Sequence, residues 1–255
     1  MLTLLIAAIT ILFVAIIFSL VNFRFLTYPL FPQTNPMRTA KHVTLDVNVF
    51  FISDLHLRAD HPFNYSNNLR RVLQERQVSQ LVVVGDLFDS PEDAHRMLEG
   101  EEATRILRIL GADRLSIKAY FVHGSPPHDP ASGEDLVRAG FDFLGECAIL
   151  SCGAIRVVAY HGHDLSRKGM FGHGWDRFIS NLSLERAWKQ FAGVPASDWV
   201  IFGHLHIPGI DTKHRVANCG GWQSVRILVR PGCTGLFLSP NSNAPEVVKV
   251  AEPKE

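Results

Sequence analysis

Several features that mark other classes of protein are missing from this sequence. Its 25 Lys and Arg residues are matched by 25 Asp and Glu residues, so no basic field of the whole chain attracts nucleic acid. Its four cysteines form no CxxC pair and no dense framework, which favours reduced thiols over disulfides. We find no internal repeat and no low-complexity tract. With 255 residues, the chain has the length of one large domain.

The first residues form a long apolar run. Residues 2–23 contain no charged side chain and are dominated by Leu, Ile, Ala, Val and Phe. About 20 apolar residues cover the roughly 30 Å hydrocarbon core of a bilayer. A cleaved signal peptide would need basic residues before the run and small residues after it, and neither is present. We therefore expect a transmembrane anchor at residues 1–23 and a proline-containing linker at residues 24–42.

The basic residues beside this run predict its orientation. Arg24, Arg38 and Lys41 all lie on its C-terminal side. By the positive-inside rule, the domain at residues 43–255 is expected in the cytoplasm. The lipid bilayer is then an expected partner of a single-pass membrane protein.

Beyond the linker, strand-like and helix-like segments alternate. This order indicates an α/β domain of mixed sheets flanked by helices, with βαβ units early and more antiparallel pairing late. The expected helices lie at residues 64–77, 91–110 and 175–191. The expected strands include residues 50–53, 81–85, 119–122, 149–151, 155–160, 199–202, 225–229, 235–238 and 247–250.

Four of the apolar strand-like runs end on Asp or His. Such ends lie at the edge of an α/β sheet where ligands collect. Carboxylates mixed with imidazoles suit Mn²⁺, Fe, Zn²⁺ or Co²⁺ better than Ca²⁺. These side chains are too many for one ion, and two ions that share Asp86 would use them all. The candidate ligands are Asp54 and His56, Asp86, His161, and His204 and His206.

In order, these motifs read D-x-H, G-D-x-x-D, a glycine-containing loop, H-G-H and G-H-x-H, and they span residues 48–239. The chain thereby resembles the calcineurin-like metallophosphoesterase superfamily, which implies a sandwich of mixed sheets flanked by helices. The resemblance implies that the first metal is held by Asp54, His56 and His206. It implies that Asp86 bridges both metals and that His161 and His204 hold the second. The segment that begins at Asn218 is similar to the family's Asn-x-Gly-Ser turn near the site.

The third block departs from the family pattern. The family has Gly-Asn-His-Asp/Glu, whose Asn ligates the second metal and whose His contacts the scissile phosphate. Here residues 123–129 read His-Gly-Ser-Pro-Pro-His-Asp. If the two prolines are an insertion, Ser125 replaces Asn and His128 keeps the role of the acid; alternatively, His123 takes that role. A hydroxyl group is a poorer metal ligand than an amide oxygen, so we expect a weaker second metal site.

Other acidic and histidine residues have alternative or plainer expected roles. Asp89 is either part of the site or the cap of the helix that begins at Pro91. His163 and Asp164 are expected to support the site or face the substrate. His173 and His214 have no motif support, and we expect surface or structural roles for them.

The resemblance implies hydrolysis of a phosphodiester, pyrophosphate or phosphomonoester by in-line attack of a metal-bridging hydroxide on phosphorus. The expected anchor favours a lipid-linked substrate. The strings at residues 52–57 and 85–89 also resemble the UDP-diacylglucosamine pyrophosphohydrolase branch of the superfamily. The Asp-Leu-Phe-Asp string occurs as well in the Mre11/SbcD-like nuclease branch, but a nuclease usually presents a basic groove. A third hypothesis is a non-catalytic, membrane-tethered scaffold on the same fold.

Overall fold

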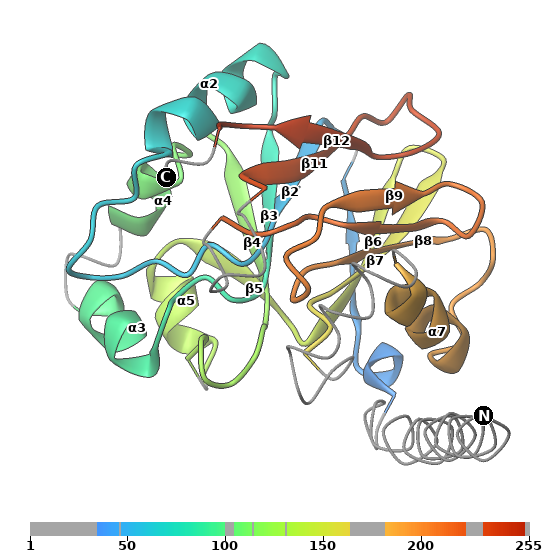
Figure 1. The fold of residues 1–255 in the computed structure, drawn as a ribbon, viewed down its shortest axis with the longest axis horizontal. Helices are drawn as coiled ribbons and strands as arrows, with labels where there is room; N and C mark the ends of the chain where they lie inside the picture. Colours follow the sequence, from blue (N-terminus) through green and yellow to red (C-terminus); the bar gives the residue numbers. More distant parts are fainter. Residues whose placement is uncertain are drawn as a thin grey trace, which may run out of the picture.

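The computed structural model describes residues 35–45, 47–99, 105–113, 115–130, 132–163, 182–222 and 232–252 (Figure 1). The expected anchor, most of the expected linker and the strand expected at residues 225–229 lie outside the described residues. Within the described part of the chain, no helix combines the length and the apolar character that crossing a membrane requires.

The first of two six-stranded sheets carries the early βαβ units. Its order is β12-β11-β2-β3-β4-β5, and the four strands from β2 to β5 are parallel neighbours. The strands are β2 (Val49–Ile52), β3 (Gln80–Val84), β4 (Lys118–Val122), β5 (Phe141–Gly145), β11 (Thr234–Leu238) and β12 (Glu246–Lys249). The strands β11 and β12 add to it antiparallel, as the sequence predicted for the late part of the chain.

The second sheet has the order β1-β6-β7-β8-β10-β9. Its strands are β1 (Lys41–Thr44), β6 (Cys147–Cys152), β7 (Ile155–Tyr160), β8 (Trp199–Phe202), β9 (Gly209–Asp211) and β10 (Val216–Asn218). The expected hairpin is confirmed, since β6 and β7 pair antiparallel. The strands β7, β8 and β10 are parallel to one another, so the expectation of antiparallel pairing late in the chain is only partly right.

Helices cover both outer faces (Figure 1). Beside the first sheet lie α2 (Ser66–Glu75), α3 (Pro91–Leu98), α4 (Arg105–Ile109) and α5 (Glu134–Arg138). On the second sheet lies α7 (Ser183–Phe191), and the 3₁₀ helix η1 (Pro36–Arg38) precedes β1. The single helix expected at residues 91–110 is wrong: α3 ends at Leu98 because Glu99 has extended backbone angles (φ −79°, ψ 131°). Gly100 follows, and glycine disfavours helix continuation.

The residues of β2 alternate between two apolar cores. Phe50 and Ile52 pack under the helices of the first sheet, whereas Val49 and Phe51 pack between the two sheets. Because side chains alternate across a strand and both faces are covered, the whole strand is apolar. Each fully buried side chain of this size contributes about 1.5–3 kcal/mol. A third core lies between the second sheet and α7, around Trp188.

Candidate metal centre

The ends of four strands bring the candidate ligands together. Asp54 follows β2 and Asp86 follows β3 in the first sheet, while His161 follows β7 and His204 follows β8 in the second. The two carboxylates are 0% and 3% exposed, so they are removed from water. A buried carboxylate is stable only if other groups balance its charge.

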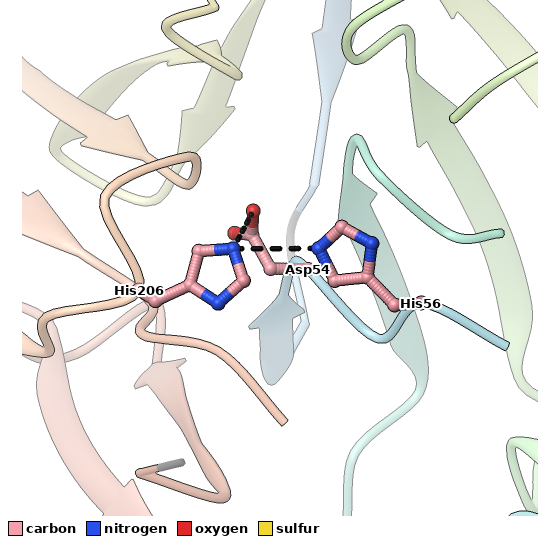
Figure 2. A group of neighbouring side chains, drawn as sticks. All are labelled: Asp54, His56 and His206. Atoms are coloured by element: carbon pink, nitrogen blue, oxygen red, sulfur yellow. Dashed lines mark hydrogen bonds and ion pairs between the residues drawn. The ribbon is translucent and has the colours of Figure 1, made fainter. Parts of the chain in front are cut away.

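A first group consists of Asp54, His56 and His206, whose ligand atoms all lie within 4.8 Å of one another. His206 Nε2 lies 3.1 Å from Asp54 Oδ1 and 3.3 Å from His56 Nε2. Figure 2 shows the two rings and the carboxylate pointing toward one another, with Asp54 and His56 on the loop after β2 and His206 on the loop after β8. Two imidazole nitrogens that face each other at 3.3 Å need a proton or a cation between them. One carboxylate and two imidazoles are ligands that divalent transition metals prefer.

A second group consists of Asp86, His161 and His204. His161 donates from Nδ1 to the Val84 carbonyl oxygen at 2.8 Å, which turns its Nε2 toward Asp86 Oδ2 at 3.2 Å. His204 Nε2 is shielded from water and has no hydrogen-bond partner among the described residues. A buried ring nitrogen without a partner is costly, and a metal ion at this position would satisfy it.

The two groups are joined through the backbone. The carboxylate of Asp54 accepts from the His204 backbone N–H, with its oxygens at 3.1 and 2.9 Å. The carboxylate of Asp54, in the first group, thus positions His204, which belongs to the second group. The arrangement therefore suits two cations that lie close together.

Five of the candidate ligands have left-handed backbone conformations. The φ angles are 53° at Asp54, 48° at His56, 50° at Asp86, 66° at His204 and 55° at His206. For residues with a side chain, such conformations cost on the order of 1–3 kcal/mol each and cluster at functional sites. The backbone is therefore strained at these five proposed ligands.

The charges of the centre are strongly coupled. Burial opposes ionisation of Asp54, but the charges of His206 and His161 outweigh it and hold its pKa well below the usual range. Burial likewise opposes ionisation of Asp86, and the charge of His161 holds its pKa well below the usual range. Although burial lowers it, the pKa of His161 rises to about 10 because the Asp86 carboxylate lies beside it. In the absence of a metal ion, a proton on His161 offsets part of the negative charge of the two carboxylates.

Burial disfavours the charged forms of two further imidazoles, those of His56 and His204. Burial and the charge of His206 lower the pKa of His56 to about 4. Burial and the charge of His161 lower the pKa of His204 to about 3. Neutral imidazole and ionised carboxylate are the forms that bind metals. His56 and His204 are therefore in the form that binds a metal near neutral pH, whereas His161 has to release its proton when an ion binds.

The third block contacts Asp86 directly. Ser125 donates to Asp86 Oδ1 from its backbone N–H at 2.7 Å and from its hydroxyl group at 2.6 Å. The buried carboxylate of Asp129 accepts from the backbone N–H groups of Asp86 at 3.1 Å, Leu87 at 3.0 Å and Gly124 at 2.6 Å. From the sequence we assign no role to Asp129. Its position as the acidic last residue of the third block (residues 123–129) is the feature that could have indicated one.

Gly124 is required by the close approach of this block to Asp86. A Cβ atom on Gly124 would lie 2.3 Å from the Asp86 backbone nitrogen and 2.5 Å from Asp86 Oδ1. The preceding turn needs glycine as well, because Gly85 has a φ of +76°. Gly85 and Gly124 thus allow residues 123–129 to pack against the carboxylate of Asp86.

The structure brings His128 to the centre. His128 Nδ1 lies 2.7 Å from the Asp89 carbonyl oxygen, and its ring meets that of His56 edge-on, with centroids 4.6 Å apart. His56, Asp89 and His128 form a third group of possible ligands. His123, the alternative candidate for the acid, instead has Nε2 2.8 Å from the Pro130 carbonyl oxygen.

Asp89 is not the cap of α3, because Ser90 is. The Ser90 hydroxyl accepts from the Asp93 backbone N–H at 3.1 Å. Asp89 instead lies between His56 Nδ1, at 3.8 Å, and Arg58 Nε, at 3.9 Å. Of the two roles that the sequence allows for Asp89, these contacts favour the one beside the centre.

Two other motif residues, His163 and Asn218, also lie near the centre. The ring of His163 stacks near that of His161, with centroids 6.3 Å apart. Asn218 donates to the Gly203 carbonyl oxygen at 2.7 Å, next to His204, and accepts from the Gly220 backbone N–H at 2.9 Å, as a structural turn would. His214 is exposed and pairs with Asp211. Asp164 and His173 lie outside the described residues.

Comparison with known proteins points to one family. Residues 47–244, more than half of the chain, match the family described as the calcineurin-like phosphoesterase superfamily domain. A UDP-2,3-diacylglucosamine hydrolase from Serratia proteamaculans is 30% identical over 153 residues, which are 58% of this chain and 60% of that protein. The corresponding Escherichia coli protein is 28% identical over 148 residues, 55% of this chain and 56% of its own length. The match thus spans less than two thirds of either relative.

Solved structures include two similar folds. Wild-type Vps29 from Entamoeba histolytica, in complex with Zn²⁺, has a TM-score of 0.46 and 16% identity, covering 80% of this chain and 99% of that one. YfcE, a phosphoesterase from E. coli, has a TM-score of 0.45 and 14% identity, covering 80% of this chain and 100% of that one.

Proposed function

This chain belongs to the calcineurin-like phosphoesterase superfamily, and on that premise we propose that it hydrolyses a phosphate ester with two divalent metal ions. Membership makes the chain a metal-dependent hydrolase; the number of ions, their identity and the substrate are our proposal. One observation carries it. Two groups, each of a carboxylate and two imidazoles with ligand atoms within 4.8 Å of one another, are joined through Asp54 and the His204 backbone.

We assign the ligands to the two ions as follows. Mixed carboxylate and imidazole donors favour Mn²⁺, Fe, Zn²⁺ or Co²⁺. When bound, such ions lower the pKa of a water molecule and offset negative charge on the phosphoryl group. The first ion is assigned to Asp54, His56 and His206, and the second to His161 and His204, with Asp86 shared between them and Ser125 beside it.

The acid in this proposal is His128. Its Nδ1 donates to the Asp89 carbonyl oxygen, so Nε2 is the ring nitrogen that delivers a proton to the leaving oxygen. The edge-on contact with His56 holds the ring beside the proposed first ion. Asp89 therefore positions His128 through its backbone and faces His56 through its carboxylate.

A lipid-linked substrate is supported by the relatives. The two hydrolases reported above are named for a diacylated sugar nucleotide. An anchor at residues 1–23 would add to this, because it would hold the centre at a bilayer surface. We propose accordingly that the domain acts on a lipid-linked phosphate ester at the cytoplasmic face of a membrane.

The test uses the full chain, stripped of metal with a chelator and reloaded separately with Mn²⁺, Zn²⁺, Co²⁺ or Fe²⁺. Three substrates are compared under matched conditions: bis(4-nitrophenyl) phosphate, UDP-diacylglucosamine in detergent micelles, and single-stranded DNA. We expect hydrolysis that depends on added metal and is fastest for the lipid. Preferred cleavage of DNA would identify a nuclease instead, and metal binding without any hydrolysis would identify a scaffold.

Asp86→Asn is the decisive variant for the two-metal proposal. It removes the shared negative charge and should abolish hydrolysis of bis(4-nitrophenyl) phosphate with Mn²⁺. Asp142→Asn is the matched control, because Asp142 is an exposed carboxylate that pairs with Lys118 on the neighbouring strand. Full activity of Asp86→Asn would overturn the proposal.

A further inference from the structure

A cavity of about 390 Å³ lies beside the metal centre, between the loop that follows His56 and the helices α3 and α4. Its volume is within the range of small-molecule sites. The basic side chains in its lining are Arg58, His61, Arg96 and Arg105. Among the described residues that line it there is no Asp or Glu; Glu101 and Glu102, between α3 and α4, lie outside the described residues. Arg58 is paired with Asp60 at 3.5 Å and with Asp89 at 3.9 Å, so the positive charge that the lining offers to a ligand comes chiefly from Arg96.

Arg96 is the side chain most available to a ligand. It is exposed on α3, and within the described ranges no hydrogen bond and no ion pair within 4 Å engages it. The carboxylate of Asp93 is near enough to interact with its charge, but that carboxylate is bound elsewhere. It accepts from the Ser90 hydroxyl at 2.7 Å and from the Ala59 backbone N–H at 2.8 Å.

The same contacts fix the walls of the cavity. The hydrogen bond from Ala59 to Asp93 ties the loop after His56 to α3. Arg58 Nε lies 3.9 Å from Asp89 Oδ2, and the other oxygen of Asp89 lies 3.8 Å from His56 Nδ1. The carboxylate of Asp89 thus lies between Arg58, which lines the cavity, and His56, a proposed metal ligand. The cavity is therefore preorganised next to the centre, which reduces the cost of binding.

One wall of the cavity is apolar. Phe63 lines it and packs against Tyr65 and Trp222, with ring centroids 5.7 and 5.6 Å away. Trp222 in turn donates its backbone N–H to the Asp54 carbonyl oxygen at 3.1 Å. Met97 adds a flexible apolar surface. The lining suits an anion that carries an apolar or flat group.

We propose that this cavity binds a phosphate group of the substrate other than the one that is hydrolysed. The inference rests on the proposed function, since it places a second part of the same substrate beside the metal centre. The planar guanidinium group of arginine can donate two parallel hydrogen bonds to phosphate oxygens, which the ammonium group of lysine cannot do. The site therefore selects substrates with two phosphate groups over simple phosphodiesters.

The first experiment measures binding without catalysis. Inorganic phosphate is titrated into the metal-free full chain by calorimetry, because without metal the carboxylates of the centre repel the anion. We expect Arg96→Gln to weaken phosphate binding about tenfold, the typical loss for one charge-assisted hydrogen bond. Arg71→Gln, an exposed arginine on α2 away from the lining, is the matched control. No phosphate binding, or equal binding by Arg96→Gln, would overturn the proposal even if the chain is an active phosphoesterase.

The second experiment asks whether that phosphate belongs to the substrate. KM and kcat of the Mn²⁺-loaded chain are measured with ADP-ribose, which has two phosphate groups, and with bis(4-nitrophenyl) phosphate, which has one. Arg96→Gln should raise KM for ADP-ribose about tenfold and several times more than KM for the single-phosphate ester, with kcat less affected. Equal changes for both esters, together with weakened binding of free phosphate, would assign the cavity to the free ion and overturn its role in substrate selection. If neither ester is hydrolysed, the titration alone decides.

Discussion

The hydroxyl group of Ser125 donates a hydrogen bond of 2.6 Å to the carboxylate of Asp86. The same oxygen atom, Asp86 Oδ1, also accepts from the Ser125 backbone N–H at 2.7 Å. If the two prolines of the third block are an insertion, Ser125 takes the place of the family's Asn, and its side chain is engaged with the proposed shared ligand. Partners of a metal ligand orient it and tune its affinity. In the proposed centre, we therefore expect Ser125 to influence the second ion through Asp86.

Ser125→Asn should tighten the weaker of the two metal-binding events, because an amide oxygen is a better ligand than a hydroxyl group. Ser125→Ala should weaken that event about tenfold, since it removes the hydroxyl hydrogen bond to Asp86. Calorimetric titration of the metal-free chain with Mn²⁺ measures both changes. Ser197→Ala, which alters an exposed serine, is the control. Unchanged stoichiometry and affinity in Ser125→Asn would contradict the proposed alignment of the third block.

His128→Gln should lower kcat for phosphate-ester hydrolysis by about 10²–10⁴-fold, the usual contribution of a positioned acid. Metal affinity should change much less, because His128 is not among the proposed ligands. His123→Gln should have little effect, since the His123 ring is engaged with the Pro130 carbonyl oxygen. Steady-state kinetics with Mn²⁺ separate the two variants. A large loss in His123→Gln with normal His128→Gln would reverse the assignment.

Lys189→Met should destabilise the chain by about 2 kcal/mol or more. The buried Lys189 ammonium group donates to the carbonyl oxygens of Asp198 at 2.6 Å and His214 at 2.8 Å, so its loss leaves both acceptors without this donor. Chemical denaturation followed by circular dichroism measures the free energy of unfolding. Lys213→Met, an exposed lysine close in sequence, should be nearly neutral. Equal stabilities of the two variants would show that Lys189 has no such role.

The four free cysteines should resist thiol reagents at pH 8, because all of them are buried. Burial and the charge of Glu146 raise the pKa of Cys147 to about 12, and burial raises the pKa of Cys219 and Cys233. Since these folded-state pKa values lie above the unfolded value of 9.0, the neutral thiols stabilise the fold below pH 9. That contribution is lost as the pH rises through 9 toward 12.

Reaction with Ellman's reagent tests this expectation. The folded chain should react slowly at pH 8, whereas the chain unfolded in guanidinium chloride should release four equivalents of thiol. Reactivity of the folded chain should rise with pH, together with a fall in stability. Fast labelling of the folded chain at pH 8 would mean that at least one thiol is accessible.

Much of the layout of the centre could be predicted from the sequence. Apolar runs that end on Asp54, Asp86 and His161 are local patterns, and the structure places these residues within two positions of the ends of β2, β3 and β7. The hairpin of β6 and β7 was predicted for the same reason, since its turn is short and contains Gly153. Local patterns therefore sufficed wherever a single strand or turn decided the outcome.

Contacts between distant residues could not be predicted in this way. His56 and His206 are 150 residues apart, and their distance of 3.3 Å depends on how the two sheets pack. Pairing late in the chain was expected to be more antiparallel, but β8 pairs parallel with both β7 and β10, and β10 was not among the expected strands. The cavity beside Arg96 likewise depends on three segments that no single motif connects.

The centre draws its side chains from both sheets, which has a consequence for the order of folding. Asp54 and Asp86 follow strands of the first sheet, whereas His161 and His206 come after strands of the second. A partly folded intermediate with only one sheet formed would hold an incomplete set of ligands. Capture of the metal is therefore expected to be among the last steps of folding, after the two sheets have docked.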